Sequence, residues 1–251
     1  MKLVDQSELT AKDLVVTDIR ISELPSSSSP SSSWKRRSSN IWLERSELSD
    51  KFEQAVRAVD VLFGEDAVEP RPQWTLMHRP LQLGPETDIP AARLTVLRGT
   101  FEPGRNVRPE LRVRKNGEFR VVQISDMHMT TGAAICRDAV DAHGNRLADC
   151  EADPLTVEFI KHILKVEKPD LVVLTGDQLH HDLSDSLTAM LKTVAPFVDA
   201  GIPYAFVFGN HDSEGRYALS RESRLLQKLY LREVTDGDQE LPGGAKQLYT
   251  R

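Results

Sequence analysis

The sequence predicts an α/β protein in which a mostly parallel sheet with crossover helices, over residues 119–251, follows a small β-rich domain, over residues 1–118. From residue 119 the apolar pattern alternates strand, helix, strand, helix, strand, which is typical of parallel sheets with right-handed crossovers. Before residue 118 the apolar runs are short and are separated by Gly and Pro clusters. With 39% hydrophobic and 28% charged residues in a chain of 251, both parts can bury a core.

The first part is predicted to contain short strands packed as a small β-sandwich. Residues 14–21 alternate, placing Val15, Thr17, Ile19 and Ile21 on one face. Further strands are predicted at 41–44, 55–63, 74–77 and 92–97. The segment 55–63 also fits a helix, because Val56, Val59 and Phe63 recur at helical spacing. We expect this part to serve packing, partner binding or autoregulation, since it contains no catalytic constellation.

A low-complexity segment interrupts these strands. Residues 25–33 consist only of proline and serine, which cannot bury enough apolar surface to offset their ordering entropy, so we predict a mobile loop over residues 25–40. The run Trp34-Lys-Arg-Arg-Ser-Ser39 within it is either a solvated charged loop or a target for a kinase that recognises basic residues.

Two crossover helices are predicted in the second part. The first begins with Asp153 as N-cap and Pro154 at the first helical position, and ends at Lys168-Pro169. The second spans residues 184–200 and stops at Gly201. A last helical stretch is predicted over 220–232. The apolar face of the first helix is expected to comprise Leu155, Phe159, Ile160, Ile163 and Leu164.

Polar residues follow each predicted strand of the parallel sheet. The strand at 119–125 leads into Asp126 and His128, the strand at 171–175 leads into Asp177, and the strand at 204–208 leads into Asn210, His211 and Asp212. Because parallel sheets carry their sites outside the carboxyl ends of their strands, these side chains should converge.

This ligand set suits manganese, iron or zinc. Two such ions bridged by Asp177 could activate water and hold the leaving oxygen in a phosphoryl transfer. His211 would then face the phosphate as a proton donor or charge stabiliser, and Asp212 would fix its tautomer.

Net charge, the N-terminal sequence and the cysteines indicate which partners and which cellular location to expect. A net charge of −6 argues against a general nucleic-acid or anionic-membrane binder. The N-terminus has no signal-peptide pattern and no window is apolar enough to span a membrane, so a cytoplasmic location is expected. In a reducing compartment Cys136 and Cys150 should be free thiols.

The three strand-end motifs resemble those of the calcineurin-like metallophosphoesterases, whose signature is Asp-x-His, Gly-Asp and Gly-Asn-His-Asp/Glu. The likeness is closest to fungal cell-cycle regulator phosphatases and plant purple-acid-phosphatase-like proteins. It covers residues 119–225 and includes the segments Ser125-Asp-Met-His128, Thr131-Gly132, Cys136-Arg-Asp138, Cys150-Glu-Ala-Asp-Pro154, Glu167 to Gln178 and Gly209 to Gly215.

The resemblance implies hydrolysis of a phosphomonoester by water activated at two metal ions, and we expect the substrate to be a phosphoprotein. It assigns Asp126 and His128 to the first metal, Asp177 as the bridge and Asn210 to the second metal, with His211 as the catalytic histidine that binds no metal. Purple acid phosphatases have a tyrosine ligand shortly after the Gly-Asp. This chain has Gln178, Leu179 and His180 there. His180 and His181 are either extra metal ligands or surface residues, and we expect surface residues because histidines just past a strand usually are.

One departure from the family pattern concerns the second half of the fold. Family members complete the site with later histidines that end in Gly-His-x-His, and this sequence has no histidine after His211. We therefore expect only the N-terminal half of the sandwich, with the remainder missing or supplied by a partner, and weak metal binding and slow turnover by this chain alone. The alternative is a catalytically inactive regulator or interaction module that keeps a half-site.

Overall fold

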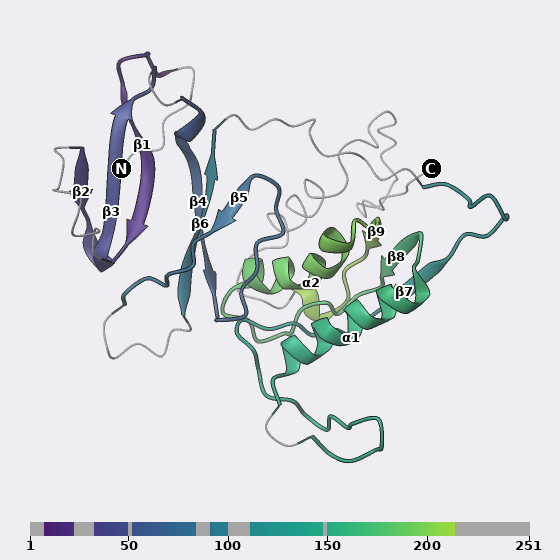
Figure 1. Ribbon diagram of the computed structural model, residues 1–251. Coiled ribbons are helices and arrows are strands. Elements are labelled where there is room, and N and C mark those ends of the chain that lie inside the picture. The colour runs from purple at the N-terminus through teal and green to yellow at the C-terminus, as the bar shows by residue number, and fades with distance from the viewer. Residues whose placement is uncertain are drawn as a thin grey trace, which may run out of the picture.

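The structure is a computed structural model that describes residues 8–22, 33–49, 52–83, 91–99, 111–147 and 150–213. Figure 1 shows two parts, with the first strands on one side and the helices and parallel sheet on the other. The Pro/Ser run up to residue 32 and the helix predicted over 220–232 lie outside the described residues.

Two antiparallel sheets of three strands form the predicted small β-sandwich. The first has the order β1-β3-β2, with β1 at Leu14–Ile21, β2 at Trp34–Arg36 and β3 at Ile41–Glu47. The second has the order β4-β6-β5, with β4 at Val56–Phe63, β5 at Trp74–Leu76 and β6 at Ala92–Arg98. The sheets share one apolar core, to which both contribute buried side chains: Ile19, Ile21, Leu43, Leu94 and Val96.

The strand predicted at 55–63 is confirmed and its helical alternative is wrong, because β4 pairs with β6 from Val56 to Phe63 and the ladder satisfies its backbone. Within the segment 25–40, residues 34–36 form β2, which pairs with β3, and a 3₁₀ turn, η2 (Ser38–Asn40), follows it. The mobility of this segment stays a prediction. A second short 3₁₀ turn, η3 (Phe52–Gln54), precedes β4. Phosphorylation of Ser38 or Ser39 stays a prediction.

The second part contains the predicted parallel sheet. Its order is β7-β8-β9, with β7 at Val121–Ile124, β8 at Leu171–Leu174 and β9 at Tyr204–Phe206. Helix α1 (Ala152–Glu167) connects β7 to β8, and α2 (Ser186–Ala200) connects β8 to β9 (Figure 1). Alternate strand residues face these helices in one core that includes Ile160, Val172, Leu174, Met190 and Val194. A 3₁₀ turn, η4 (His211–Ser213), follows β9.

The start of α1 corrects the sequence prediction. Its N-cap is Glu151, and Asp153 lies inside the first turn with its side chain buried. The reason is tertiary, because the Asp153 carboxylate accepts bonds from the backbone N–H of Thr130 at 2.8 Å and from the Lys192 ammonium. The predicted apolar face is also only partly buried, since Leu155 and Phe159 are 37% and 63% exposed.

The ends of both helices follow the sequence signals. Lys168 and Gly201 adopt left-handed C-cap conformations, with φ of 47° and 65°. Asp185 caps α2 by accepting the Thr188 N–H at 2.8 Å. Helix α2 is buried over most of its length because it packs against α1, the parallel sheet and β4. No helix within the described ranges is long and apolar enough to cross a membrane.

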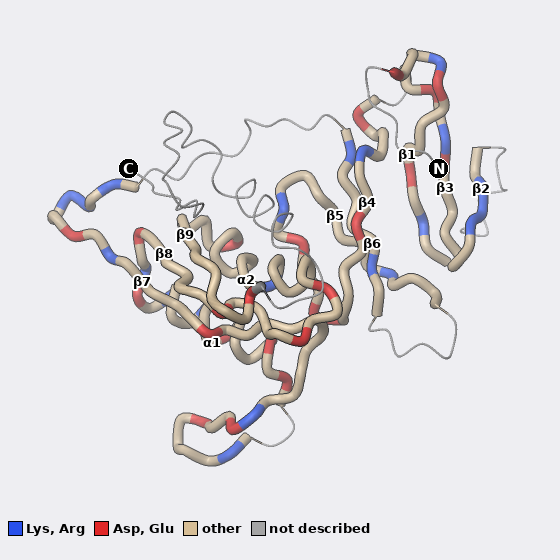
Figure 2. The backbone as a smooth tube through the Cα atoms, turned by 180° about the vertical axis from the view of Figure 1, so that it is seen from behind, with Lys and Arg blue, Asp and Glu red and all other residues tan. Residues whose placement is uncertain are grey.

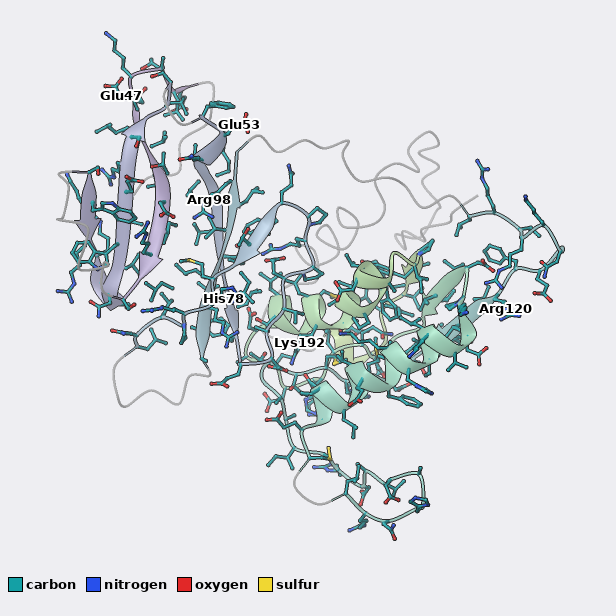
Figure 3. All side chains as sticks on the ribbon, in the orientation of Figure 1. Glu47, Glu53, His78, Arg98, Arg120 and Lys192 are labelled. Atoms are coloured by element: carbon teal, nitrogen blue, oxygen red, sulfur yellow. A yellow bond between two sulfur atoms is a disulfide. The ribbon has the colours of Figure 1, made fainter. Side chains whose placement is uncertain are left out.

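The two parts are joined through α2. Leu62 and Ala67, which lie in and just after β4, belong to the core of the helices and parallel sheet. The Phe63 N–H donates to Thr188 Oγ1 at 3.0 Å, and the buried Lys192 ammonium donates to Asp66 Oδ2 at 2.6 Å. Figure 3 shows Lys192 at this junction, and Figure 2 shows acidic and basic positions interspersed along both parts. The domain boundary at residue 118 stays a prediction.

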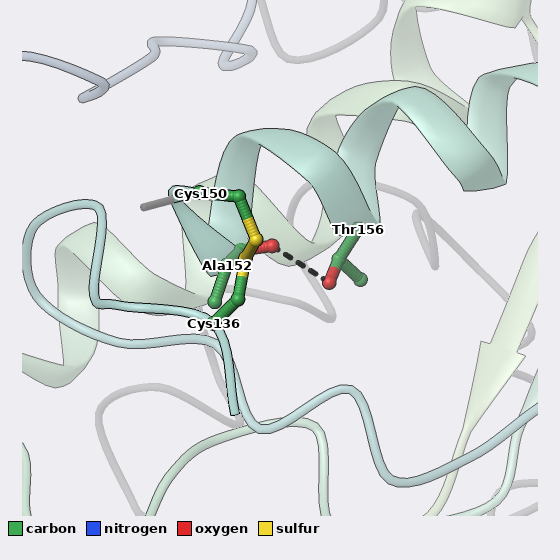
Figure 4. Close-up of a disulfide and its surroundings, with 4 residues drawn as sticks. All are labelled: Cys136, Cys150, Ala152 and Thr156. Atoms are coloured by element: carbon green, nitrogen blue, oxygen red, sulfur yellow. Dashed lines mark hydrogen bonds between the residues drawn. A yellow bond between two sulfur atoms is a disulfide. The ribbon is translucent and has the colours of Figure 1, made fainter. Parts of the chain in front are cut away.

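A disulfide closes the segment between β7 and α1. Cys136 and Cys150 are bonded, with their Cα atoms 5.4 Å apart (Figure 4). They face each other because the Cys136 N–H donates to the Cys150 carbonyl at 2.9 Å, beside an antiparallel bridge between Ile135 and Glu151. The expectation of free thiols is therefore wrong. It rested on the assumption of a reducing compartment. The spacing of two cysteines also does not reveal that the hairpin closed by the Ile135–Glu151 bridge places them opposite each other.

Candidate metal centre

The chain segments that follow β7 and β8 continue side by side beyond the strands. The Asp126 N–H donates to the Gly176 carbonyl at 3.0 Å, the His128 N–H to the Asp177 carbonyl at 3.1 Å and the Met129 N–H to the Gln178 carbonyl at 2.9 Å. The side chains of Met129 and Leu179 are fully buried at the end of this pairing. The polar residues that lie between each strand and its buried anchor, Met129 or Leu179, are thereby held at one edge of the sheet.

Three of the predicted ligands meet at this edge. Asp126, His128 and Asp177 each offer a ligand atom, and these atoms lie within 4.8 Å of one another. His128 Nε2 lies 3.9 Å from Asp126 Oδ1. The Asp126 side chain is 65% exposed and that of His128 is 34% exposed, so the group is open to solvent.

The backbone at these three residues is unusual. Asp126, His128 and Asp177 have φ values of 56°, 47° and 52°, in the left-handed region that non-glycine residues rarely adopt. Such conformations cost about 1–3 kcal/mol each and persist only where surrounding structure imposes them. Here the paired segments and their buried anchors impose them, and they turn the three side chains toward a common point.

Two glycines let the segments after β8 and β9 approach each other closely. A Cβ added to Gly176, which has φ of 110°, would lie 2.9 Å from the Gly209 Cα. A Cβ added to Gly209 would collide with the Asp177 carboxylate. The glycines of the Gly-Asp and Gly-Asn-His-Asp motifs are thus required by packing, because only a bare backbone fits between the two segments.

The residues after β9 contact Asp177 mainly through their backbone. The His211 N–H donates to Asp177 Oδ1 at 2.9 Å, which fixes that carboxylate and leaves its other oxygen for a ligand. Asn210, which is exposed, lies between Gly209 and His211 in the same turn.

Asp212 ties the turn after β9 to the segment after β8. Its buried carboxylate accepts the Leu179 N–H at 2.8 Å and the Gly209 N–H at 2.7 Å. Asp212 therefore positions backbone. Its predicted role in fixing the tautomer of His211 stays a prediction.

Two further histidines lie beside the predicted ligands: His181 is exposed, as predicted, and His180 is partly buried. The His180 ring centroid lies 6.1 Å from that of His128, and the His181 and His128 centroids each lie 5.4 Å from that of His211. Burial, followed by the neighbouring imidazoles of His181 and His128, lowers the pKa of His180 below its ordinary value of 6.5. The available signal was their position three and four residues after Asp177.

The donor set fits a divalent metal ion. Two carboxylates and an imidazole are ligands that manganese, iron and zinc accept. The His128 Nδ1 atom is buried and has no hydrogen-bond partner among the described residues, which is costly for an imidazole unless something else binds the ring. Asp126, His128 and Asp177 could therefore hold one ion.

The chain matches known proteins over this region. The sequence profile described as calcineurin-like phosphoesterase matches residues 119–247. The chain is 38% identical to "Phosphatase DCR2" of Saccharomyces cerevisiae over 173 residues, which cover 67% of this chain and 29% of that protein. It is 35% identical over 106 residues to "Probable inactive purple acid phosphatase 28" of Arabidopsis thaliana, covering 41% of this chain and 26% of that protein.

A third relative is "Probable inactive purple acid phosphatase 29" of Arabidopsis thaliana, which is 32% identical over 129 residues, covering 51% of this chain and 32% of that protein. The chain thus spans about a third or less of the length of these relatives. No solved structure matches the chain significantly.

Proposed function

Because the chain belongs to the calcineurin-like phosphoesterase family, we propose that it carries the metal-binding part of a phosphomonoesterase site whose substrate is a phosphorylated protein. The observation that carries this proposal is the convergence of Asp126, His128 and Asp177 at the carboxyl edge of the parallel sheet. The yeast relative is named a phosphatase, which supports the same reaction class.

The proposed roles follow from the contacts of each residue. Asp126, His128 and Asp177 would hold a first divalent ion, and Asp177 and Asn210 would contribute to a second; manganese, iron and zinc all suit these ligands. When bound, such ions supply positive charge against the phosphate oxygens and lower the pKa of water.

His211 is the proposed proton donor. Its backbone is fixed on Asp177 Oδ1, and its ring lies beside that of His128. An imidazole held there can donate a proton to the leaving oxygen or stabilise the charge that develops on it. Asp212 contributes by holding the turn that carries His211.

The first test is metal binding by the 251-residue chain. In titration calorimetry with Mn²⁺, Asp177→Asn should weaken binding by at least about 100-fold, because even residues that only orient a ligand contribute 10–100-fold. Asp199→Asn, at an exposed position near the end of α2, is the matched control and should bind as the parent does. Equal Mn²⁺ binding by the parent and Asp177→Asn would refute the proposed site.

The second test is hydrolysis of p-nitrophenyl phosphate with Mn²⁺. A phosphomonoesterase should lose this activity in both Asp177→Asn and His211→Ala, while His211→Ala keeps its metal. The alternative function is an inactive interaction module, which the names of the two plant relatives favour. That function predicts Mn²⁺ binding without turnover, or no binding at all.

A further inference from the structure

The His180 and His181 side chains have features of a ligand-binding surface. Their rings lie against each other in a tilted arrangement, with centroids 4.2 Å apart and an angle of 30° between the planes. Together they adjoin the two histidines of the candidate metal centre, since His180 lies near His128 and His181 lies near His211. Four imidazoles from the segments after β7, β8 and β9 are therefore neighbours of one another.

The hydrogen bonds of His180 determine what its ring can offer. The Asp182 N–H donates to His180 Nδ1 at 3.2 Å, so that nitrogen is unprotonated and the ring proton resides on Nε2. The backbone of His180 is fixed as well, because its N–H donates to the Met129 carbonyl at 3.0 Å. Its Nε2–H has no acceptor among the described residues, and the neighbouring His181 is exposed.

The distances between these imidazoles distinguish metal binding from anion binding. Nitrogens that share one ion lie within about 4 Å of each other, because metal–nitrogen bonds are about 2.0–2.1 Å long. Within the described residues, the group close enough to share an ion comprises Asp126, His128 and Asp177, without His180 or His181. N–H donors farther apart are suited to an anion whose several oxygens each accept a hydrogen bond.

We propose that His180 and His181, together with His211, form a phosphate-binding wall beside the metal centre, and that the wall selects phosphomonoesters over phosphodiesters. The reason is the number of acceptors: a monoester offers three unesterified oxygens to the imidazoles and the metal centre, whereas a diester offers two. This inference rests on the proposed function for the orientation of substrate, and the tests below separate the two.

Imidazole NMR of the full chain tests the wall directly. We expect inorganic phosphate to shift the ring resonances of His180 and His181 and to leave those of His162, on an exposed part of α1, in place. Phenyl phosphate should act like phosphate, and dimethyl phosphate should bind about tenfold more weakly, the scale of one lost hydrogen bond to a charged group. If the two rings do not respond to phosphate, with or without Mn²⁺, the proposal is overturned.

Variants distinguish hydrogen bonding from ring packing. His181→Phe keeps an aromatic ring but has no donor, so it should weaken phosphate binding by about tenfold. His181→Gln restores an N–H and should recover part of the loss, and His162→Phe is the control. Mn²⁺ affinity should be unchanged in all three. Loss of Mn²⁺ affinity in His181→Phe would make His181 a ligand and contradict the wall.

The outcomes also separate this inference from the proposed function. If Mn²⁺ binding does not depend on Asp177 but the His180 and His181 rings respond to phosphate, the proposed function fails and the anion site stands. If Asp177-dependent Mn²⁺ binding is present and the rings do not respond, the function stands and the wall fails.

Discussion

At the scale of single residues, the site depends on how closely the backbone segments approach. Gly176 and Gly209 lie against each other, and Gly209 also touches the Asp177 carboxylate. The His211 N–H and the Asp212 carboxylate then hold the same segments by hydrogen bonds. The position of Asp177 is therefore set by residues that bind no ion themselves.

Gly209→Ala tests this dependence. The added methyl group would occupy the space of Asp177 Oδ1, so the carboxylate must move. We expect Mn²⁺ affinity to fall by about 10- to 100-fold, the range for loss of groups that orient a ligand. Gly144→Ala, in the hairpin turn with nothing within 4 Å of the new Cβ, should leave Mn²⁺ affinity unchanged. Normal metal binding by Gly209→Ala would contradict the close packing described here.

At the scale of elements, the hairpin between β7 and α1 depends on its disulfide. The hairpin extends away from the helices in Figure 1 and exposes apolar side chains, with Ile135 85% and Val140 57% exposed. It therefore has little core of its own. The covalent bond between Cys136 and Cys150 and a few backbone bonds, such as Leu147 N–H to Ala139, hold its shape.

Reduction should loosen this hairpin while the rest of the fold persists. In the chain-entropy description, a closed loop of about 15 residues contributes about 3 kcal/mol. We expect reductant to speed amide hydrogen exchange at Cys136 and Leu147, and the Cys136→Ser/Cys150→Ser variant to exchange rapidly with or without it. Unreduced protein should also resist alkylation by iodoacetamide. Two alkylated thiols in unreduced protein would show that the bond does not form.

At the scale of the whole molecule, Lys192 links the β-rich part to the candidate metal centre. Its buried ammonium binds Asp66 from the segment after β4, the Gly132 carbonyl at 2.8 Å and Asp153 in the first turn of α1. Asp153 in turn accepts the Thr130 N–H, two residues beyond His128. One side chain thus connects both parts with the segment that carries the first ligands.

Lys192→Met should lower the free energy of unfolding by about 3–5 kcal/mol, because it leaves buried carboxylates without their cation. Lys161→Met, on the exposed side of α1, should change it by less than about 0.5 kcal/mol. Urea denaturation measures both. A small effect of Lys192→Met at neutral pH would mean that apolar packing and the Phe63–Thr188 hydrogen bond hold the parts without the Lys192 ion pairs.

The pH dependence of this variant has a definite sign. Burial already raises the pKa of Asp153 above 3.8, outweighing its bonds to Lys192 and Thr130. A raised folded-state pKa means that folding favours the protonated carboxyl, so stability from this group is present at low pH and lost as pH rises through that pKa. Without Lys192 the pKa should rise further. Lys192→Met should therefore be least damaging in acid and most damaging at neutral pH.

Local sequence patterns predicted most of the strands and helices of this chain. Strands 14–21, 92–97 and 171–175 and both crossover helices were predictable, because alternation, helical spacing and the glycine at 201 act within a few residues. The carboxyl-edge position of Asp126, His128 and Asp177 followed from parallel topology. The segment 55–63 was not decided locally, because its pairing with strand β6, at residues 92–98, excluded the helix.

The sequence by itself determined the family, the order of strands and helices and the residues able to bind a metal, because those depend on short patterns and residue chemistry. Only the tertiary structure decided that Asp153 is a buried partner of Lys192, that Cys136 and Cys150 are bonded, that Asp212 holds backbone and that His180 and His181 border the site. The first three of these contacts join residues 14 to 39 positions apart, and the last brings together rings that follow different strands. No local sequence pattern specifies which distant groups will meet.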